Sequence, residues 1–133
     1  MIKTITVRFK VPGFHEWGDA PEHRVYLSKT HRHLFGFRVT IPVSHYNRDI
    51  EFHDLLSLAK ESLDRFGYTA RVRYSSDQFY DFLGMSCEQI ANHVAKAVLD
   101  ATFVRWCEVE VDEDGECSAT VRKKPAKAGQ SGG

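Results

Sequence analysis

The chain has 133 residues, the length of one domain, and can bury a hydrophobic core without disulfides or metals. Its 18 basic and 18 acidic side chains balance, which argues against nucleic-acid or membrane partners held by bulk charge. We find no apolar run long enough to span a bilayer and no signal-peptide pattern, so we expect a cytoplasmic protein. The three cysteines lack C-x-x-C spacing and are predicted to be reduced thiols, not disulfides or zinc ligands: Cys87, Cys107 and Cys117.

The first element predicted along the chain is a strand over residues 4–11, in which apolar and polar side chains alternate. The Pro12-Gly13 pair is predicted to end this strand. Residues 14–29 then show neither a helical nor a strand period, and an ordered loop of this length in a small domain is often functional. The two histidines of this loop, His15 and His23, are therefore candidate metal ligands.

A second strand is predicted over residues 31–43, where apolar side chains occupy the odd positions from Phe35 onward. His31 and His33 share that parity, so both imidazoles project from the apolar face at the start of the strand. Two histidines at positions i and i+2 on one strand face can reach a single metal ion, and zinc accepts imidazole nitrogen readily. The pair therefore indicates a zinc site, with ordinary packed or exposed histidines as the alternative.

An amphipathic helix is predicted over residues 52–66, because its apolar side chains form one stripe along the helix. Either Asp49 or Glu51 is suited to cap the N-terminus of this helix. Gly67 follows the last apolar residue, where a C-terminal cap belongs. The sequence therefore predicts both ends of the helix as well as its buried face.

Residues 68–85 are irregular and rich in aromatic residues, which we expect to fill the space beneath a loop. A short strand over residues 71–74 is one option within this segment. Ser86 and Gln89 have the spacing of a capping box, so they predict the start of a second helix that runs to about Asp100.

Two further strands are predicted over residues 103–111 and 117–121, joined by an acidic turn. The order strand, strand, helix, helix, strand, strand indicates an α+β fold with a four-stranded antiparallel sheet and both helices on one face. The other face is expected to be partly apolar, with Trp106 exposed unless subunits associate. We place the domain at residues 1–122 and a disordered tail at residues 123–133.

Four short motifs lie at matching places in this order: His15, His31-Arg32-His33, Glu51-Phe52 with Asp54-Leu55, and Met85-Ser86-Cys87-Glu88. Together with the element order, they resemble the 6-pyruvoyl-tetrahydropterin synthase and 6-carboxytetrahydropterin synthase family, which has the tunnelling fold. The similarity covers most of residues 2–121. The resemblance implies a zinc ion held by His15, His31 and His33. It also implies a homo-oligomer, a trimer or hexamer that closes into a barrel, which agrees with the open edges expected of the sheet.

The sequence departs from the family at two catalytic positions. Leu27 stands where family members usually have a catalytic cysteine, and Arg65 replaces the histidine of an Asp-His pair. Other acid–base groups are expected near the site, and we take Asp64 and Tyr26 as the predicted catalytic residues. The four candidates weighed for this role are Tyr26, Lys29, His53 and Asp64.

A glutamate on the third long strand anchors the pterin ring in the family. Three acidic residues of this chain are candidates for that role: Glu108, Glu110 and Asp112. We choose Glu110 as the substrate-binding residue because it shares a strand face with Trp106. A carboxylate suits the guanidine-like edge of a pterin or guanine, since it accepts paired hydrogen bonds.

The resemblance implies a zinc-dependent lyase that acts on dihydroneopterin triphosphate or a related pterin. Because two catalytic residues are replaced, we expect weak or no turnover of that substrate but retained binding of the ring. One alternative is a non-catalytic tunnelling-fold protein that binds a pterin, purine or nucleotide between subunits, and another is a small structural zinc protein. The expected partners are a small molecule and further copies of the chain, with no nucleic acid and no membrane.

Overall fold

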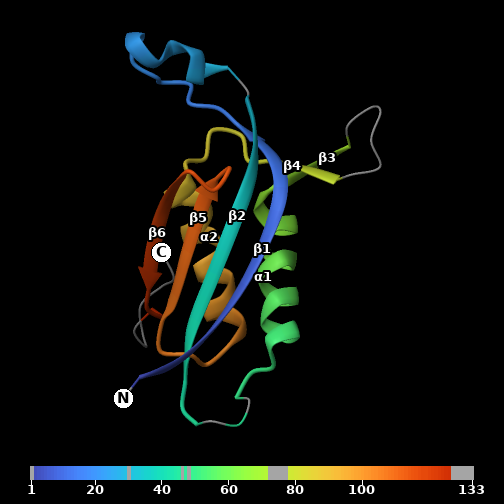
Figure 1. Ribbon diagram of the computed structural model, residues 1–133, viewed down its shortest axis with the longest axis vertical. Coiled ribbons are helices and arrows are strands. Elements are labelled where there is room, and N and C mark those ends of the chain that lie inside the picture. The colour runs from blue at the N-terminus through green and yellow to red at the C-terminus, as the bar shows by residue number, and fades with distance from the viewer. Residues whose placement is uncertain (1, 30, 46, 48, 72–77, 127–133) are drawn as a thin grey trace.

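The computed structural model describes residues 2–29, 31–45, 47, 49–71 and 78–126. Figure 1 shows a twisted sheet with helices behind it. The elements in chain order are β1 (Lys3–His15), the 3-10 segment η1 (Glu22–Ser28), β2 (His31–Val43), α1 (Phe52–Phe66), β3 (Tyr68–Arg71), β4 (Gln78–Asp81), α2 (Cys87–Ala101), β5 (Cys107–Glu113) and β6 (Cys117–Lys123). Residues 127–133 of the predicted tail lie outside the described part of the chain.

The described strands form one six-stranded sheet in the order β3-β4-β1-β2-β5-β6. The antiparallel pairing of β1 with β2, β2 with β5 and β5 with β6 confirms the four predicted strands and their mixed α+β arrangement. The prediction of only four strands was wrong, because the aromatic segment adds β3 and β4 beside β1. The short strand expected over residues 71–74 is centred earlier, and residues 72–74 lie outside the described part.

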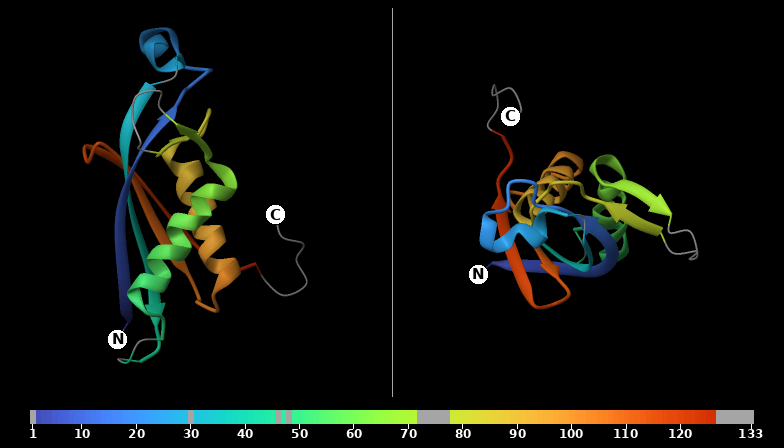
Figure 2. Two further views of the ribbon diagram at one scale, coloured as in Figure 1. Left: turned by 90° about the vertical axis from the view of Figure 1, so that its right-hand side faces the viewer. Right: turned by 90° about the horizontal axis from the view of Figure 1, so that it is seen from above.

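Both helices cover one face of the sheet, as predicted (Figure 2, left). Their apolar stripes meet the odd-numbered side chains of the long strands, and this contact forms the core. Its fully buried side chains include Phe35, Val39, Leu55, Leu63, Ile90, Val94, Val109 and Val111. Burial of this apolar surface is the main stabilising contribution to the fold, about 25 cal/mol per Å² removed from water.

The helix caps follow the sequence signals. Ser86 and Gln89 form the expected capping box at the start of α2. Of the two cap candidates for α1, Glu51 is the cap, since its Oε2 accepts the backbone N–H of His53 at 2.8 Å. Gly67 donates its N–H to the Leu63 carbonyl oxygen at 2.7 Å at the end of α1. The caps therefore fix where each helix begins and where α1 ends.

The Pro12-Gly13 pair does not end the first strand, contrary to the prediction, because β1 continues to His15. Gly13 is needed for the approach of β4, which pairs with β1 at Gly13 and Phe14. A Cβ atom at Gly13 would lie 2.9 Å from Phe82 Cε2 and 3.0 Å from the Tyr80 carbonyl oxygen. The glycine therefore serves close strand packing here, and the strand carries His15 to the same end of the sheet as β2.

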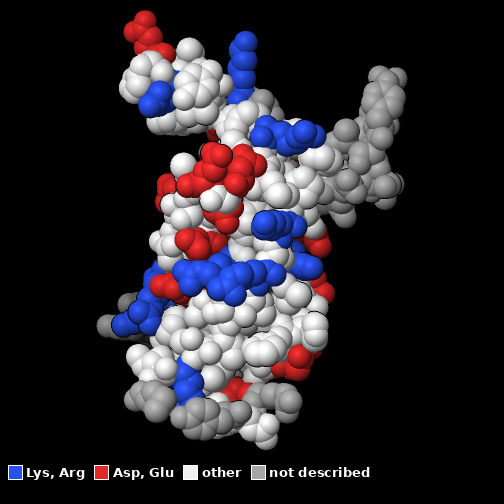
Figure 3. Space-filling model, in the orientation of Figure 1, with Lys and Arg blue, Asp and Glu red and all other residues white. Residues whose placement is uncertain are grey.

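The face of the sheet away from the helices carries charged side chains together with apolar ones, among them Trp106 and the exposed Leu34. Arg38 on β2 donates to Glu110 on β5 at 3.1 Å, and the Arg122 guanidinium lies 3.8 Å from the centre of the Trp106 ring. Figure 3 shows basic and acidic side chains gathered across this face. Among the helices of the described residues, none is long and apolar enough to cross a membrane.

Candidate metal centre

Three histidines meet where β1 ends and β2 begins. The strand register pairs His15 with His31 and Gly13 with His33, so all three imidazoles project from the core face of the sheet. One ring nitrogen from each histidine can be chosen so that the three atoms lie within 4.8 Å of one another. The ring centroids of His15 and His31 are 4.5 Å apart, and those of His31 and His33 are 4.9 Å apart. The structure thus brings together the three predicted metal ligands.

Each imidazole is oriented by a hydrogen bond from its Nδ1 atom. His15 Nδ1 lies 3.1 Å from the Met85 carbonyl oxygen, and His31 Nδ1 lies 3.0 Å from the Lys29 carbonyl oxygen. His33 Nδ1 lies 2.6 Å from Asp114 Oδ2. Carbonyl and carboxylate oxygens only accept hydrogen bonds, so each Nδ1 carries the proton. The unprotonated Nε2 atom of each ring is then available as a metal ligand.

His15 gives the clearest sign of a missing partner. The residue is only 8% exposed, and its buried Nε2 atom makes no hydrogen bond among the described residues. It faces Glu113 Oε1 at 3.1 Å, and an unprotonated nitrogen and a carboxylate oxygen both present lone pairs, so this contact is favourable only with a cation or a proton between them. Burial lowers the pKa of His15 below its ordinary value, against the opposing effects of the Met85 hydrogen bond and the Glu113 charge. A buried, neutral imidazole with an unused lone pair is costly unless a cation occupies the site. The residues therefore fit a zinc ion held by three imidazole nitrogens.

Glu113, the last residue of β5, also belongs to this site, although the sequence analysis did not select it. Its Oε1 atom lies 3.1 Å from His15 Nε2, and its Oε2 atom lies 3.5 Å from His33 Nε2. The signal was present in the sequence, because Glu113 shares odd parity with the buried Val109 and Val111. Pairing of Phe35 with Glu113 then places the carboxylate beside the histidines.

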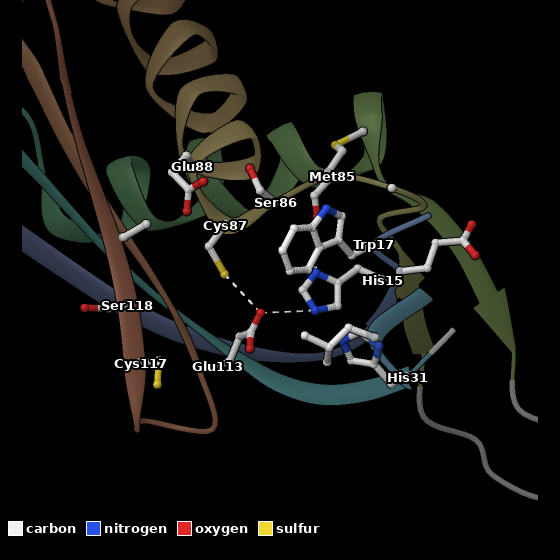
Figure 4. A pocket seen from close by; sticks show the side chains of 14 residues that line it. His15, Trp17, His31, Met85, Ser86, Cys87, Glu88, Glu113, Cys117 and Ser118 are labelled. Atoms are coloured by element: carbon white, nitrogen blue, oxygen red, sulfur yellow. Dashed lines mark hydrogen bonds and ion pairs between the residues drawn. The ribbon is translucent and has the colours of Figure 1, made fainter. Parts of the chain in front are cut away.

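A cavity of about 470 Å³ opens beside the histidines and is partly apolar. Figure 4 shows His15, His31, Cys87 and Glu113 turned toward it. Its walls come from the end of β1, from η1, from the start of α2 and from the β5–β6 hairpin. The lining includes Leu27, His31, Cys87, Glu113 and Cys117. The space suits a small heterocyclic ligand, which commonly binds in pockets of roughly 300–1,000 Å³.

Two of the three cysteines line this cavity, although the sequence suggested no role for them. Cys87 is the first residue of α2, and its Sγ atom lies 3.6 Å from Glu113 Oε1. Burial, followed by the negative charge of Glu113, raises the pKa of the Cys87 thiol to about 12. Cys117 is exposed at the start of β6, and Cys107 is buried in the core. Cys87 is therefore a protonated thiol beside the candidate metal site.

The turn between β5 and β6 fixes His33. Asp114 adopts a left-handed backbone conformation with φ of 58°, which aspartate tolerates better than most residues. Its carboxylate accepts the Leu34 N–H at 2.8 Å as well as the Nδ1–H of His33. These bonds hold the pKa of Asp114 below its ordinary value. A turn that the sequence marked only as a hairpin connection thus orients one of the metal ligands.

The remaining predicted site residues lie elsewhere. Glu110 is on the opposite face of the sheet, where Ser118 and Arg38 donate hydrogen bonds to it. Asp64 on α1 accepts a hydrogen bond from the Tyr80 hydroxyl at 3.0 Å, and Tyr26 is exposed on η1. His53 lies at the start of α1, while Lys29 contributes its backbone carbonyl to His31. None of these side chains is among the residues that line the histidine cavity.

No protein-family model and no curated protein matches the sequence. Solved structures do match its fold. The 6-pyruvoyl tetrahydropterin synthase of Caenorhabditis elegans matches with a TM-score of 0.62 and 10% identity, over 93% of this chain and 97% of that chain. The Plasmodium vivax 6-pyruvoyltetrahydropterin synthase, with its catalytic glutamate replaced by alanine, matches with a TM-score of 0.60 and 14% identity, over 94% and 99% of the chains.

A third neighbour is a dihydroneopterin aldolase from Burkholderia thailendensis bound to guanine. It matches with a TM-score of 0.51 and 11% identity, over 94% of this chain and 93% of that chain. Identities this low show a shared fold and leave the chemistry to be argued from the site. The chain therefore shares the tunnelling fold of these solved structures.

Proposed function

We propose that this protein is a divergent zinc-dependent lyase of the 6-pyruvoyl/6-carboxytetrahydropterin synthase type, acting on a dihydropterin triphosphate or a related pterin. The observation that carries the proposal is the convergence of one ring nitrogen from each of three histidines, with His15 Nε2 buried and without a hydrogen bond among the described residues, beside a carboxylate and a cavity. The fold shared with two 6-pyruvoyl tetrahydropterin synthases supports the same conclusion.

His15, His31 and His33 would hold the zinc ion. Zinc in such a site supplies a Lewis acid that polarises a substrate carbonyl and acidifies the neighbouring C–H. Glu113 is the residue placed to accept that proton, because its carboxylate faces the histidines and lines the cavity. The partly apolar wall of the cavity excludes water from the face of a bound ring, which strengthens the electrostatic contacts made there.

Glu113 is the candidate base because Leu27, which also lines the cavity, cannot accept a proton. The family's usual cysteine is missing at that position, so a carboxylate from β5 is the candidate base here. A catalytic glutamate also occurs in the Plasmodium vivax enzyme named above. We expect turnover of dihydroneopterin triphosphate to be weak, since loss of a positioned acid or base costs on the order of 10²–10⁴-fold in rate.

The second candidate function is non-catalytic binding of a pterin, purine or nucleotide. It is favoured by one observation, namely that neither Asp64 nor Tyr26, the predicted catalytic residues, lines the cavity. The guanine bound to the dihydroneopterin aldolase neighbour indicates the class of ring that this fold accommodates. Under both functions, we propose that the chain assembles as a trimer or hexamer through its sheet edges.

Three measurements on the protein purified without chelator test the proposal. Elemental analysis is expected to give one zinc per chain. Calorimetric titration with neopterin and guanine is expected to show binding, and a turnover assay with dihydroneopterin triphosphate is expected to show slow, Glu113-dependent product formation. Binding with no turnover would leave the non-catalytic function, whereas absence of both zinc and ring binding would refute the proposal.

A further inference from the structure

We infer that Cys87 is a positioning residue that holds the Glu113 carboxylate against the histidine cluster by donating its S–H to Oε1. The inference rests on the proposed function, because it concerns the carboxylate assigned there as base. The contact joins α2 to β5 across the mouth of the metal site (Figure 4).

The geometry of the contact supports a donor role for the thiol. The Sγ atom lies 3.6 Å from Glu113 Oε1, and the residue is buried with 9% exposure. Cys87 is itself held in place, since Ser86 and Gln89 cap the helix that begins with it. A rigid donor on a capped helix therefore faces a carboxylate at the end of a strand.

Glu113 needs such a partner. Its side chain is 30% exposed, and a glutamate with free rotamers loses up to about 2 kcal/mol of conformational free energy on being fixed. Oε1 lies between the Cys87 thiol and His15 Nε2, at 3.6 and 3.1 Å, and Oε2 lies on the side of His33, at 3.5 Å from its Nε2. The hydrogen bond thus selects one rotamer of Glu113 and leaves one oxygen free to accept a proton.

The thiol is suited to donate but not to replace the missing cysteine base. Its raised pKa keeps the proton on sulfur at neutral pH, and it is the thiolate that acts as a nucleophile or base. The thiol is a weak hydrogen-bond donor, but the negative charge of the Glu113 carboxylate strengthens the bond. We therefore expect loss of this bond to have a moderate effect on the position of Glu113.

A double-mutant cycle on zinc affinity tests the inference without requiring turnover. The proteins are the wild type, Cys87→Ala, Glu113→Gln and the double variant, each titrated with zinc against a chelator. We expect Glu113→Gln to weaken zinc binding about tenfold or more, because it removes the negative charge that faces the metal-binding Nε2 atoms of His15 and His33. Cys87→Ala is expected to weaken zinc binding about threefold to tenfold when Glu113 is present. In the Glu113→Gln background, the same substitution is expected to weaken zinc binding less than about twofold.

Two further variants separate positioning from packing. Cys87→Ser retains a donor and is expected to keep more affinity than Cys87→Ala, and Cys117→Ala, which changes the same cavity wall, is expected to be neutral. In cobalt-substituted protein, Cys87→Ala and Glu113→Gln are expected to shift the visible absorption bands in the same way. Thermal unfolding confirms that each variant is folded.

The outcomes distinguish the two proposals. A wild-type protein that binds zinc, but in which the effects of Cys87→Ala and Glu113→Gln multiply independently, would overturn the role of Cys87 and leave the proposed function intact. An unchanged affinity in Cys87→Ala would do the same. A wild-type protein without zinc affinity would overturn the proposed function together with the inference that rests on it.

Discussion

Backbone carbonyls decide which nitrogen two of the histidines present to the site. Met85 and Lys29 accept the Nδ1–H of His15 and His31, so the rings are oriented before any metal arrives. This preorganisation lowers the entropic cost of metal binding, because the tautomer and the rotamer of both imidazoles are already fixed. The side chains of the metal ligands are therefore only part of the site, and their carbonyl acceptors complete it.

The first prediction concerns the ligands themselves. Replacement of His31 by alanine is expected to weaken zinc binding by more than about a hundredfold, beyond the effect of losing an outer hydrogen-bond partner. His23→Ala is the matched control, since His23 is an exposed histidine of η1 outside the cluster. Elemental analysis after dialysis measures both. Retention of the metal in the His31 variant would contradict the ligand assignment.

The cysteines are predicted to react at different rates with a thiol reagent at neutral pH. Burial raises the pKa values of Cys87 and Cys107 to about 12, so their thiolate populations are small. Cys117 is exposed and is expected to react first. Mass spectrometry after brief labelling checks this, with labelling in denaturant as the control that should modify all three. Early labelling of Cys107 in the native protein would show that the core is looser than described.

Short elements near His15, where β1 ends, surround the histidine cluster. Strand β4 adds to β1 in parallel, and the segment after it carries Met85 to His15, 70 residues away in the sequence. The β5–β6 hairpin brings Glu113 and Asp114 to the same place. The metal site therefore depends on strand pairings whose partners lie far apart in the chain.

The approach of β4 to β1 predicts an asymmetric response to two glycine substitutions. Gly13→Ala is expected to destabilise the protein by about 1–3 kcal/mol, the usual cost of overpacking, because the added Cβ meets Phe82, Phe35 and the Tyr80 carbonyl within 3.0 Å. Gly18→Ala is the control, since nothing lies within 4 Å of its Cβ. Urea unfolding measures both. Equal stability of the two variants would argue against the β1–β4 packing.

The cross-strand contacts of Glu110 predict a pH-dependent contribution to stability. Hydrogen bonds from Ser118 and then Arg38 lower its pKa in the folded state. A lowered folded pKa means that stability is present above the unfolded value of about 4.3 and is lost as pH falls through the folded value. Glu110→Gln is therefore expected to reduce stability at neutral pH by at most about 1 kcal/mol and to have no effect in strong acid.

Thermal unfolding across this pH range tests the contribution of Glu110. The control is Glu61→Gln on the exposed side of α1, which is expected to leave the pH dependence unchanged. A stability difference between wild type and Glu110→Gln that persists unchanged at the acidic end would show that the charge of Glu110 is not its cause.

The described sheet ends in two edge strands, β3 and β6, and η1 projects beyond one end of the sheet (Figure 1). Apolar side chains of η1, including Val25 and Tyr26, are exposed. Open edges and exposed apolar side chains favour association with further copies of the chain. The histidine cavity lies beside η1, so such an association would also affect access to the site.

We therefore predict a trimer or hexamer in solution. Light scattering coupled to size-exclusion chromatography is expected to report a mass three or six times that of the 15.2 kDa chain, stable on dilution to micromolar concentration. The physical reason is that pairing of β6 with another subunit satisfies backbone groups that water otherwise covers. A mass of one chain across the whole concentration range would contradict the assembly.

Local patterns in the sequence determined much of the fold. The alternation along β1, β2, β5 and β6, the stripes of α1 and α2 and the capping box at Ser86 depend on residues a few positions apart. The shared parity of His31 and His33 is equally local, and it correctly put both on the core face. The place of His15 needed the family resemblance, because the Pro12-Gly13 pair concealed the end of β1.

Only the tertiary structure decided what surrounds those histidines. Glu113 reaches them through the β2–β5 register, Cys87 through the packing of α2, and Asp114 through a turn 81 residues from His33. Glu110 was chosen from its strand face, but the helices cover the opposite face, so the choice depended on a packing direction that alternation leaves open. Contacts between distant segments have no local period, and these contacts set the acid–base surroundings of the site.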